Sequence, residues 1–337
     1  MAKWLNGSCL KNDVVISSRI RLARNLEDVR FPQDMTMEES KEVTDEILDV
    51  VKGWESDKYE FHKIGDLSSL ERRVLIEEHL ISPSLIESPD KSSFLLRNDE
   101  KVTIMINEED HLRVQILSYG LNLENDWNEL NQIDDMLEAK LNYAFSGKFG
   151  YLTACPTNVG TGIRASVMIH LPCLVLTGYI NNMLQAVNQI GLTTRGLYGE
   201  GTEALGNVFQ ISNQVTLGET EEEIIQKLNN VILQIAEKEK DIRNKLLEVR
   251  RHEMEDRVFR SLGLLKYARA MSSRESMKLF SDVKMGIEMG ILKDMNSNTI
   301  DSLMILTQPA SLQKYFNKDL IPEERDIKRA ELIRERL

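Results

Sequence analysis

Length, composition and charge set the first limits on what this chain does. Its 337 residues are enough for one large domain and a smaller one, each with its own core. The formal net charge of −12, from 54 Asp and Glu against 42 Lys and Arg, excludes broad, non-specific binding to nucleic acid or to an anionic membrane surface. Any basic site must therefore be local.

The cysteines indicate the compartment. Cys9, Cys155 and Cys173 are few and odd in number, and none forms a CxxC pair, which is typical of a reducing environment. The first residues contain no apolar run of signal-peptide length, so we expect a cytoplasmic protein. Residues 165–194 carry no charged side chain, but Pro172 and several amides interrupt them, which indicates an amphipathic helix on a core rather than a membrane span.

In chain order, the first predicted element is a strand over residues 14–22. Apolar and polar residues alternate there, so Arg19 and Arg21 share one face. Apolar spacing and capping residues then predict helices over 36–52 and 68–79.

The middle of the chain mixes strands and helices. Residues 101–107 and 112–117 predict a β-hairpin whose acidic tip is formed by residues 108–111. Residues 126–144 follow a helical pattern, and residues 162–171 alternate again as a strand.

The last third changes character. A glycine-rich loop begins at Arg195, and residues 207–217 predict a further strand. After them the apolar spacing is helical, with no convincing strand pattern. We therefore divide the chain into an α+β domain, residues 1–250, and an all-α domain, residues 251–337.

Five arginines in the first domain could line one basic cleft. Transfer of a γ-phosphoryl group needs such positioned cations, because the planar guanidinium donates paired hydrogen bonds to phosphate oxygens. Taken alone, each arginine is better explained as a solvated surface residue, and the GxxxxGK[ST], HRD and DFG motifs of common phosphate sites are absent. The five are Arg19, Arg21, Arg113, Arg164 and Arg195.

Four longer motifs decide between these interpretations. They resemble, in the same order, the motifs of the phosphagen (guanidino) kinases. The resemblance implies an antiparallel sheet flanked by helices, ATP and Mg²⁺ as cofactors, and nucleotide-phosphate binding by the five arginines. The motifs are Ser17-Ser-Arg-Ile-Arg21, Asn107-Glu-Glu-Asp-His-Leu-Arg113, Cys155-Pro-Thr-Asn-Val-Gly-Thr-Gly-Ile-Arg164 and Arg195-Gly-Leu-Tyr-Gly-Glu200.

The resemblance also implies three catalytic residues. Glu109 and Glu200 match the guanidinium-binding carboxylates of the family, and Cys155 matches its reactive cysteine. A protonated guanidinium has no free lone pair for attack. Two carboxylates that hold it would aim one nitrogen at the γ-phosphorus and accept a proton, while Cys155 helps to orient the group. No metal-ligating residue is assigned.

Two departures from the small-molecule phosphagen kinases indicate the acceptor. The first motif begins at Ser17, which leaves no room for their helical N-terminal domain. Residues 325–330 resemble the phosphoarginine-recognition motif of bacterial protein arginine kinases of the McsB type. The resemblance implies an allosteric phosphoarginine site of Arg325, Asp326 and Arg329, whose arginines share a helix face. We therefore expect arginines of proteins, rather than free arginine, as acceptor.

Two other functions stay open at this point, a free-arginine phosphagen kinase and a non-catalytic phosphoarginine-binding adaptor. For a protein arginine kinase, the resemblance implies protein substrates with exposed arginines, such as a stress-response repressor and misfolded proteins, which are marked for Clp-type proteolysis. It also implies a zinc-binding, McsA-like activator, a Clp protease and a homodimer as partners. His170 is a hypothetical adenine contact on the strand face that carries Arg164.

Overall fold

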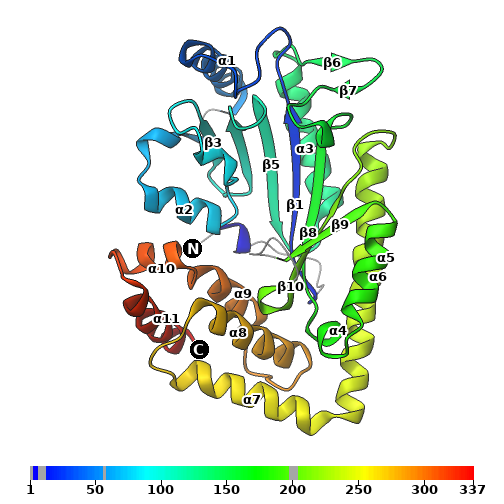
Figure 1. Cartoon of the computed structure of the whole chain (residues 1–337), viewed down its shortest axis with the longest axis vertical. Coiled ribbons are helices and arrows are strands. Elements are labelled where there is room, and N and C mark those ends of the chain that lie inside the picture. Colours follow the sequence, from blue (N-terminus) through cyan, green and yellow to red (C-terminus); the bar gives the residue numbers. More distant parts are fainter. Residues whose placement is uncertain (1–2, 7–12, 56–57, 197–203) are drawn as a thin grey trace.

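The computed structural model describes residues 3–6, 13–55, 58–196 and 204–337 (Figure 1). Its centre is an eight-stranded sheet in the order β2–β3–β4–β5–β1–β8–β10–β9, with every neighbouring pair antiparallel, which confirms the predicted fold class. The strands are β1 Val15–Arg24, β2 Tyr59–Lys63, β3 Ser93–Arg97, β4 Val102–Ile106, β5 Leu112–Tyr119, β8 Ile163–His170, β9 Leu192–Gly196 and β10 Val208–Asn213, and a separate ribbon consists of β6 Phe145–Ser146 and β7 Gly150–Tyr151.

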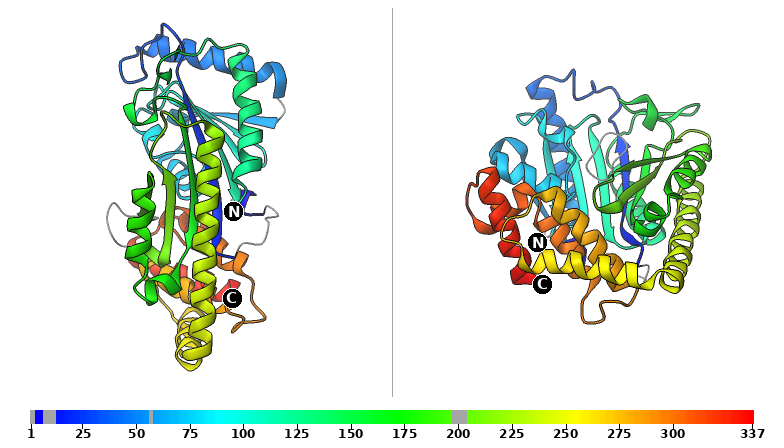
Figure 2. Two further views of the ribbon diagram at one scale, coloured as in Figure 1. Left: turned by 90° about the vertical axis from the view of Figure 1, so that its right-hand side faces the viewer. Right: turned by 60° about the horizontal axis from the view of Figure 1, so that its bottom comes forward.

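Helices cover one face of the sheet and continue beyond one end of it (Figures 1 and 2). Helix α3 packs on β1 and β5, and α6 packs on β8 and β10. The helices are α1 Met37–Glu55, α2 Ser69–Glu77, α3 Leu123–Glu138, α4 Pro172–Leu176, α5 Ile180–Gln189, α6 Glu221–Val249, α7 Arg251–Tyr267, α8 Ser273–Glu288, α9 Ser297–Leu306, α10 Pro309–Phe316 and α11 Pro322–Arg336.

The alternation in the central strand β1 produces the two faces of the sheet. Ile20 and Leu22 are fully buried in the main hydrophobic core, which includes residues of α3 and α6. Arg19 and Arg21, one residue out of step with them, project from the opposite face. The apolar face therefore holds the helical layer, and the other face is left to polar side chains.

Three features differ from the sequence-based expectations. Helix α3 ends at Glu138 rather than at residue 144, because the chain turns there to form the isolated bridge between Tyr143 and Leu26. Strands β2 and β3 were not predicted. Arg195 lies within the edge strand β9 rather than at the start of a loop, since the chain pairs with β10 up to Gly196.

Helices α7 to α11 pack beneath the sheet as a helical unit (Figure 1). Helix α8 contacts the short helix η6 (Leu205–Asn207), and α10 contacts α2. The Glu77 carboxylate at the end of α2 accepts the backbone N–H groups of Ala310 and Ser311 at 2.9 and 2.7 Å. These are first-turn N–H groups of α10, which have no partner within their own helix, so Glu77 fixes α10 to the sheet domain.

A buried charge network forms a second connection between the helical unit and the sheet domain. Glu288 of α8 lies 2.9 Å from Arg243 of α6 and 3.1 Å from Lys284, and Lys284 reaches Asp301 of α9 at 3.0 Å. His170, at the end of β8, lies beside the same network, with Nδ1 3.7 Å from Glu288. Glu288 and Lys284 are almost fully buried, so their charges rely on each other and on their neighbours rather than on water.

Candidate active site

Strand register brings the predicted phosphate arginines onto the open face of the sheet. Arg21 of β1 lies directly opposite Arg164 of β8, and Arg19 shares the face of Arg21. On the other side of β1, Arg113 of β5 lies opposite Ala23, which is on the same face of β1 as Arg19 and Arg21. Residues directly opposite on antiparallel strands project to the same face, so these four arginines converge on one surface.

Strand β10 extends this surface, which we call the arginine face, toward Arg195. Gln210 lies opposite Arg195 of β9, and its side chain accepts a hydrogen bond from Arg19 at 3.5 Å. Ser212, two residues further on, accepts one from Arg164 at 3.2 Å. Sequence reasoning did not single out Gln210 or Ser212, and the only signal available was the alternation of polar residues in that strand.

On the arginine face, the guanidinium groups of Arg19 and Arg164 contact the neutral side chains of Gln210 and Ser212. Burial, together with the neighbouring Arg113 and Arg164, lowers the pKa of Arg19 to about 10. Burial, together with the charges of Arg19, Arg113 and Arg164, also lowers the pKa of Arg21. The Arg21 Nε is buried without a hydrogen-bond partner among the described residues. Half-buried cations without a carboxylate partner are costly, so this arrangement favours a polyanionic ligand such as a nucleoside triphosphate.

The hairpin tip between β4 and β5 presents two carboxylates at the border of the arginine face. The Arg113 guanidinium donates to Glu108 at 2.6 Å and to Glu109 at 3.1 Å. Glu108 is buried, receives a further hydrogen bond from Ser82, and has its pKa raised by burial. The Glu109 side chain remains 48% exposed, so it is the carboxylate of this pair that an incoming substrate can reach.

Asn107 and Asp110 of the same motif hold the hairpin tip in place through hydrogen bonds to neighbouring segments. The Asn107 amide donates to the Ser40 carbonyl of α1 at 2.9 Å, and its backbone is left-handed with φ of 57°. Asp110 accepts the Ala154 N–H at 2.7 Å, which ties the tip to the segment before Cys155. These residues are buried, so their contribution is to position Glu109 rather than to contact substrate.

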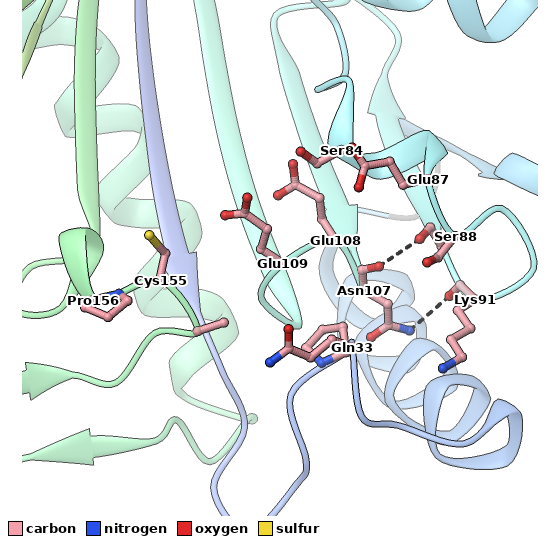
Figure 3. Close-up of a pocket in the computed structure, with 13 residues that line it drawn as sticks. Gln33, Ser84, Glu87, Ser88, Lys91, Asn107, Glu108, Glu109, Cys155 and Pro156 are labelled. Carbon is pink, nitrogen blue, oxygen red and sulfur yellow. Dashed lines mark hydrogen bonds between the residues drawn. The ribbon is translucent and has the colours of Figure 1, made fainter.

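Next to Glu109 is a cavity of about 430 Å³, which we call the acceptor pocket (Figure 3). Glu109 and Cys155 lie on one side of it, and residues of the 84–91 segment form the other side. The Cys155 Sγ lies 3.0 Å from the Thr157 hydroxyl and is only partly buried. The pocket thus places a carboxylate and a thiol together, at the border of the arginine face.

The loop that carries Cys155 depends on Gly160. Its φ is +113°, and a Cβ there would lie 2.1 Å from the Thr216 carbonyl oxygen. We expect Gly160→Ala to lower the free energy of unfolding by about 3 kcal/mol, because a steric clash adds to backbone strain. Gly178→Ala is the matched control, since φ there is +76° but no atom lies within 4 Å of the added carbon, and its cost should be about 1 kcal/mol. Equal losses in urea titrations of the two variants would contradict this account.

The structure places the remaining predicted residues as follows. Glu200, the second expected carboxylate, lies outside the described residues. His170 is fully buried, with Nε2 2.8 Å from the Ser281 hydroxyl of α8, so it contacts the helical unit and the adenine hypothesis is not supported. Cys173 is also buried, and Glu239, a residue of α6, accepts the N–H of Cys173 at 2.9 Å.

The two predicted allosteric arginines, Arg325 and Arg329, do not both face solvent where they could bind one phosphate group. Arg329 is 2% exposed, and its guanidinium donates to the Thr307 and Met271 carbonyls at 2.9 and 2.8 Å and to Asp326 at 2.6 Å. Arg325 and Asp326 are partly exposed on α11. Because the Thr307 and Met271 carbonyls accept its other hydrogen bonds, Arg329 is held in the interior and positions Asp326 from there.

Comparison with known proteins agrees with this geometry. Residues 40–242 match the model of the ATP:guanido phosphotransferase C-terminal catalytic domain, and residues 251–337 match that of the protein-arginine kinase McsB C-terminal domain. The protein-arginine kinase of Halothermothrix orenii is 51% identical over all of this chain and 97% of its own length, and that of Bacillus subtilis is 49% identical over all of this chain and 93% of its own. The chain belongs to the protein-arginine kinase family. A crystal structure of lombricine kinase shares the fold with a TM-score of 0.61 and 27% identity, covering 69% of this chain and 68% of that one.

The family requires ATP with Mg²⁺, and the residues present fit the nucleotide. The arginine face gathers guanidinium groups from neighbouring strands, which is the donor set that a triphosphate needs. Among residues 3–6, 13–55, 58–196 and 204–337, no cluster of His, Cys, Asp and Glu has the composition of a metal site. When ATP binds as its magnesium complex, the phosphate oxygens of the nucleotide would supply ligands to the ion. None of the helices in the described part of the chain is long and apolar enough to cross a membrane.

Proposed function

We propose that this chain transfers the γ-phosphoryl group of ATP to arginine side chains of proteins, and that Glu109 is the carboxylate that receives the acceptor. The observation that carries the proposal is the position of Glu109. It stands between the arginine face, through its contact with Arg113, and the acceptor pocket, where Cys155 lies. An anionic donor and a cationic acceptor are thus brought to the two sides of a single carboxylate.

In this arrangement the arginine face holds the triphosphate and neutralises charge as it shifts toward the leaving group. Glu109 binds the acceptor guanidinium and aims one of its nitrogens at the γ-phosphorus. The new N–P bond forms while the bond from the γ-phosphorus to the β,γ-bridging oxygen breaks, and ADP leaves. The proton released by the nitrogen passes to a carboxylate, for which we propose Glu109 together with Glu200.

The acceptor pocket favours an arginine that belongs to a polypeptide. Its volume of about 430 Å³ exceeds what a bare guanidinium needs, and most of its lining residues are partly exposed. The matches to protein-arginine kinases over the whole chain support the same acceptor. A free-arginine kinase would gain from a closed pocket, because a small substrate has few other groups to bind.

The test compares acceptors directly. The protein is incubated with ATP labelled in the γ-phosphate and either an unfolded protein that contains arginine or free arginine. Label on the polypeptide that is lost in acid but retained in base is the expected result, since phosphoarginine has a P–N bond. Label only on free arginine would overturn the proposal in favour of a phosphagen kinase, and no consumption of ATP would favour the non-catalytic adaptor.

We also propose that residues 251–337 form a regulatory domain next to the catalytic domain of residues 1–250. Arg325 and Asp326 would bind phosphoarginine there, with Arg329 as the residue that positions Asp326. Loss of phosphoarginine stimulation in Asp326→Ala, with basal turnover retained, is the expected result. A cytoplasmic location, a homodimer, a zinc-binding activator and a Clp protease partner complete the proposal, and these rest on the family resemblance alone.

A further inference from the structure

One wall of the acceptor pocket has no part in the proposed reaction. Ser84, Glu87 and Ser88 line it, and in Figure 3 they lie across the pocket from Cys155. A cavity of about 430 Å³ is in the range that encloses a ligand of many atoms, so an arginine side chain at Glu109 leaves this wall free to contact neighbouring parts of the substrate.

Glu87 is the acidic residue of this wall. Glu108 and Glu109 are both bonded by Arg113. Lys91, the lysine in the lining, donates its ammonium group to the Met35 carbonyl, and in Figure 3 its side chain points away from the carboxylates. Glu87 is exposed, and no described residue forms a hydrogen bond or ion pair with its carboxylate. With Glu109 assigned to the acceptor guanidinium, Glu87 is the carboxylate of the pocket that remains for another group of the substrate.

The segment that carries Glu87 is held firmly. Leu85, two residues earlier, is fully buried in a small hydrophobic cluster with Ile64 and Phe94. The Ser82 hydroxyl accepts the Leu85 N–H at 3.2 Å and donates to Glu108. Glu87 thus has a fixed position relative to the catalytic tip, which is what a group that selects substrates requires.

We infer that Glu87 selects the substrate polypeptide, by pairing with a lysine or arginine side chain that flanks the target arginine. The inference rests on the proposed function, because it assigns a second contact to the same polypeptide acceptor. A cation is the group that fits, since the wall offers one unpaired carboxylate and two serine hydroxyls, and the ammonium group of Lys91 is directed away from them to the Met35 carbonyl. Glu87 acts here as a specificity residue and takes no part in phosphoryl transfer.

The experiment uses three peptides that each contain one arginine. They differ only in the residue before it and the residue after it, which are both Lys in the first peptide, both Gln in the second and both Glu in the third. With the parent protein, kcat/KM for the Lys peptide should exceed that for the Gln peptide about fivefold at low salt, and the ratio should shrink in high salt. Glu87→Gln should bring the two peptides to within about twofold, and Glu87→Lys should reverse the order so that the Glu peptide is preferred.

Glu46→Lys is the matched control, because Glu46 is an exposed residue of α1 outside the pocket lining and the charge change is identical. It should keep the order of the parent. Turnover of the Gln peptide should be unchanged in Glu87→Gln, which separates selection from catalysis or folding. The same Lys-to-Gln ratio in parent, Glu87→Gln and Glu87→Lys would overturn the inference alone. Failure of the parent to phosphorylate any peptide would instead contradict the proposed function on which it rests.

Discussion

Replacement of Glu109 by glutamine should lower kcat for arginine phosphorylation by about 10²- to 10⁴-fold, the range expected when a proton acceptor is removed. Glutamine keeps the size of the side chain but neither accepts the proton nor attracts a guanidinium by charge. Nucleotide affinity should change little, because Arg113 keeps its 2.6 Å contact with Glu108 and its place on the arginine face. Label transfer from ATP to an unfolded protein measures the first effect, and titration with a fluorescent ATP analogue measures the second.

Glu46→Gln serves as the control for this prediction, since it removes one exposed acidic charge from α1, away from the site. Its turnover should match that of the parent. A Glu109→Gln variant with turnover within twofold of the parent would exclude Glu109 as the essential base. A variant that loses nucleotide affinity and turnover together would show instead that Glu109 mainly supports Arg113.

The arginine face could be predicted in part from local patterns. Alternation in β1 and β8 places Arg19, Arg21 and Arg164 on one side of their strands, and this depends only on the period of a strand. Which strands are neighbours does not follow from that period. The contact of Gln210 with Arg19 joins residues 191 positions apart, and it becomes visible only when the sheet order is known.

The exposure of a side chain depends on residues far away in the sequence, so the sequence could not indicate which predicted site residues are buried. Helical spacing puts Arg325 and Arg329 on one face, but the carbonyls of Thr307 and Met271 draw Arg329 into the interior. Glu87 is inconspicuous in the sequence for the same reason, since its relation to the acceptor pocket arises from the fold of the 84–91 segment. Motifs predicted a catalytic role for Glu109, whereas the surroundings of each group required the structure.

Removal of the Glu288 carboxylate in Glu288→Ala should lower the free energy of unfolding by about 3 kcal/mol. Glu288 is 1% exposed and lies between Lys284 and Arg243, so its loss leaves buried positive charge without its central partner. Both cations keep one other carboxylate, Asp301 for Lys284 and Asp13 for Arg243, which is why we expect the lower end of the range for a broken buried ion pair. Urea titration followed by circular dichroism measures the change.

The pH dependence of this loss distinguishes charge from packing. Burial alone would raise the pKa of Glu288, but Lys284, the hydrogen bond with His170 and the charge of Arg243 outweigh it and lower the pKa below its ordinary value. The ionised carboxylate therefore stabilises the fold above the ordinary glutamate pKa of about 4.3, and this contribution disappears as the pH falls through the lowered value in the folded state. The difference in the free energy of unfolding between parent and Glu288→Ala should be widest near neutral pH and shrink in acid.

The control is Glu253→Ala, which removes a 66% exposed carboxylate of α7 and should cost less than about 0.5 kcal/mol at any pH. A gap that stays constant down to acid pH would mean that Glu288 acts by filling space, and that its charge does not join the helical unit to the sheet.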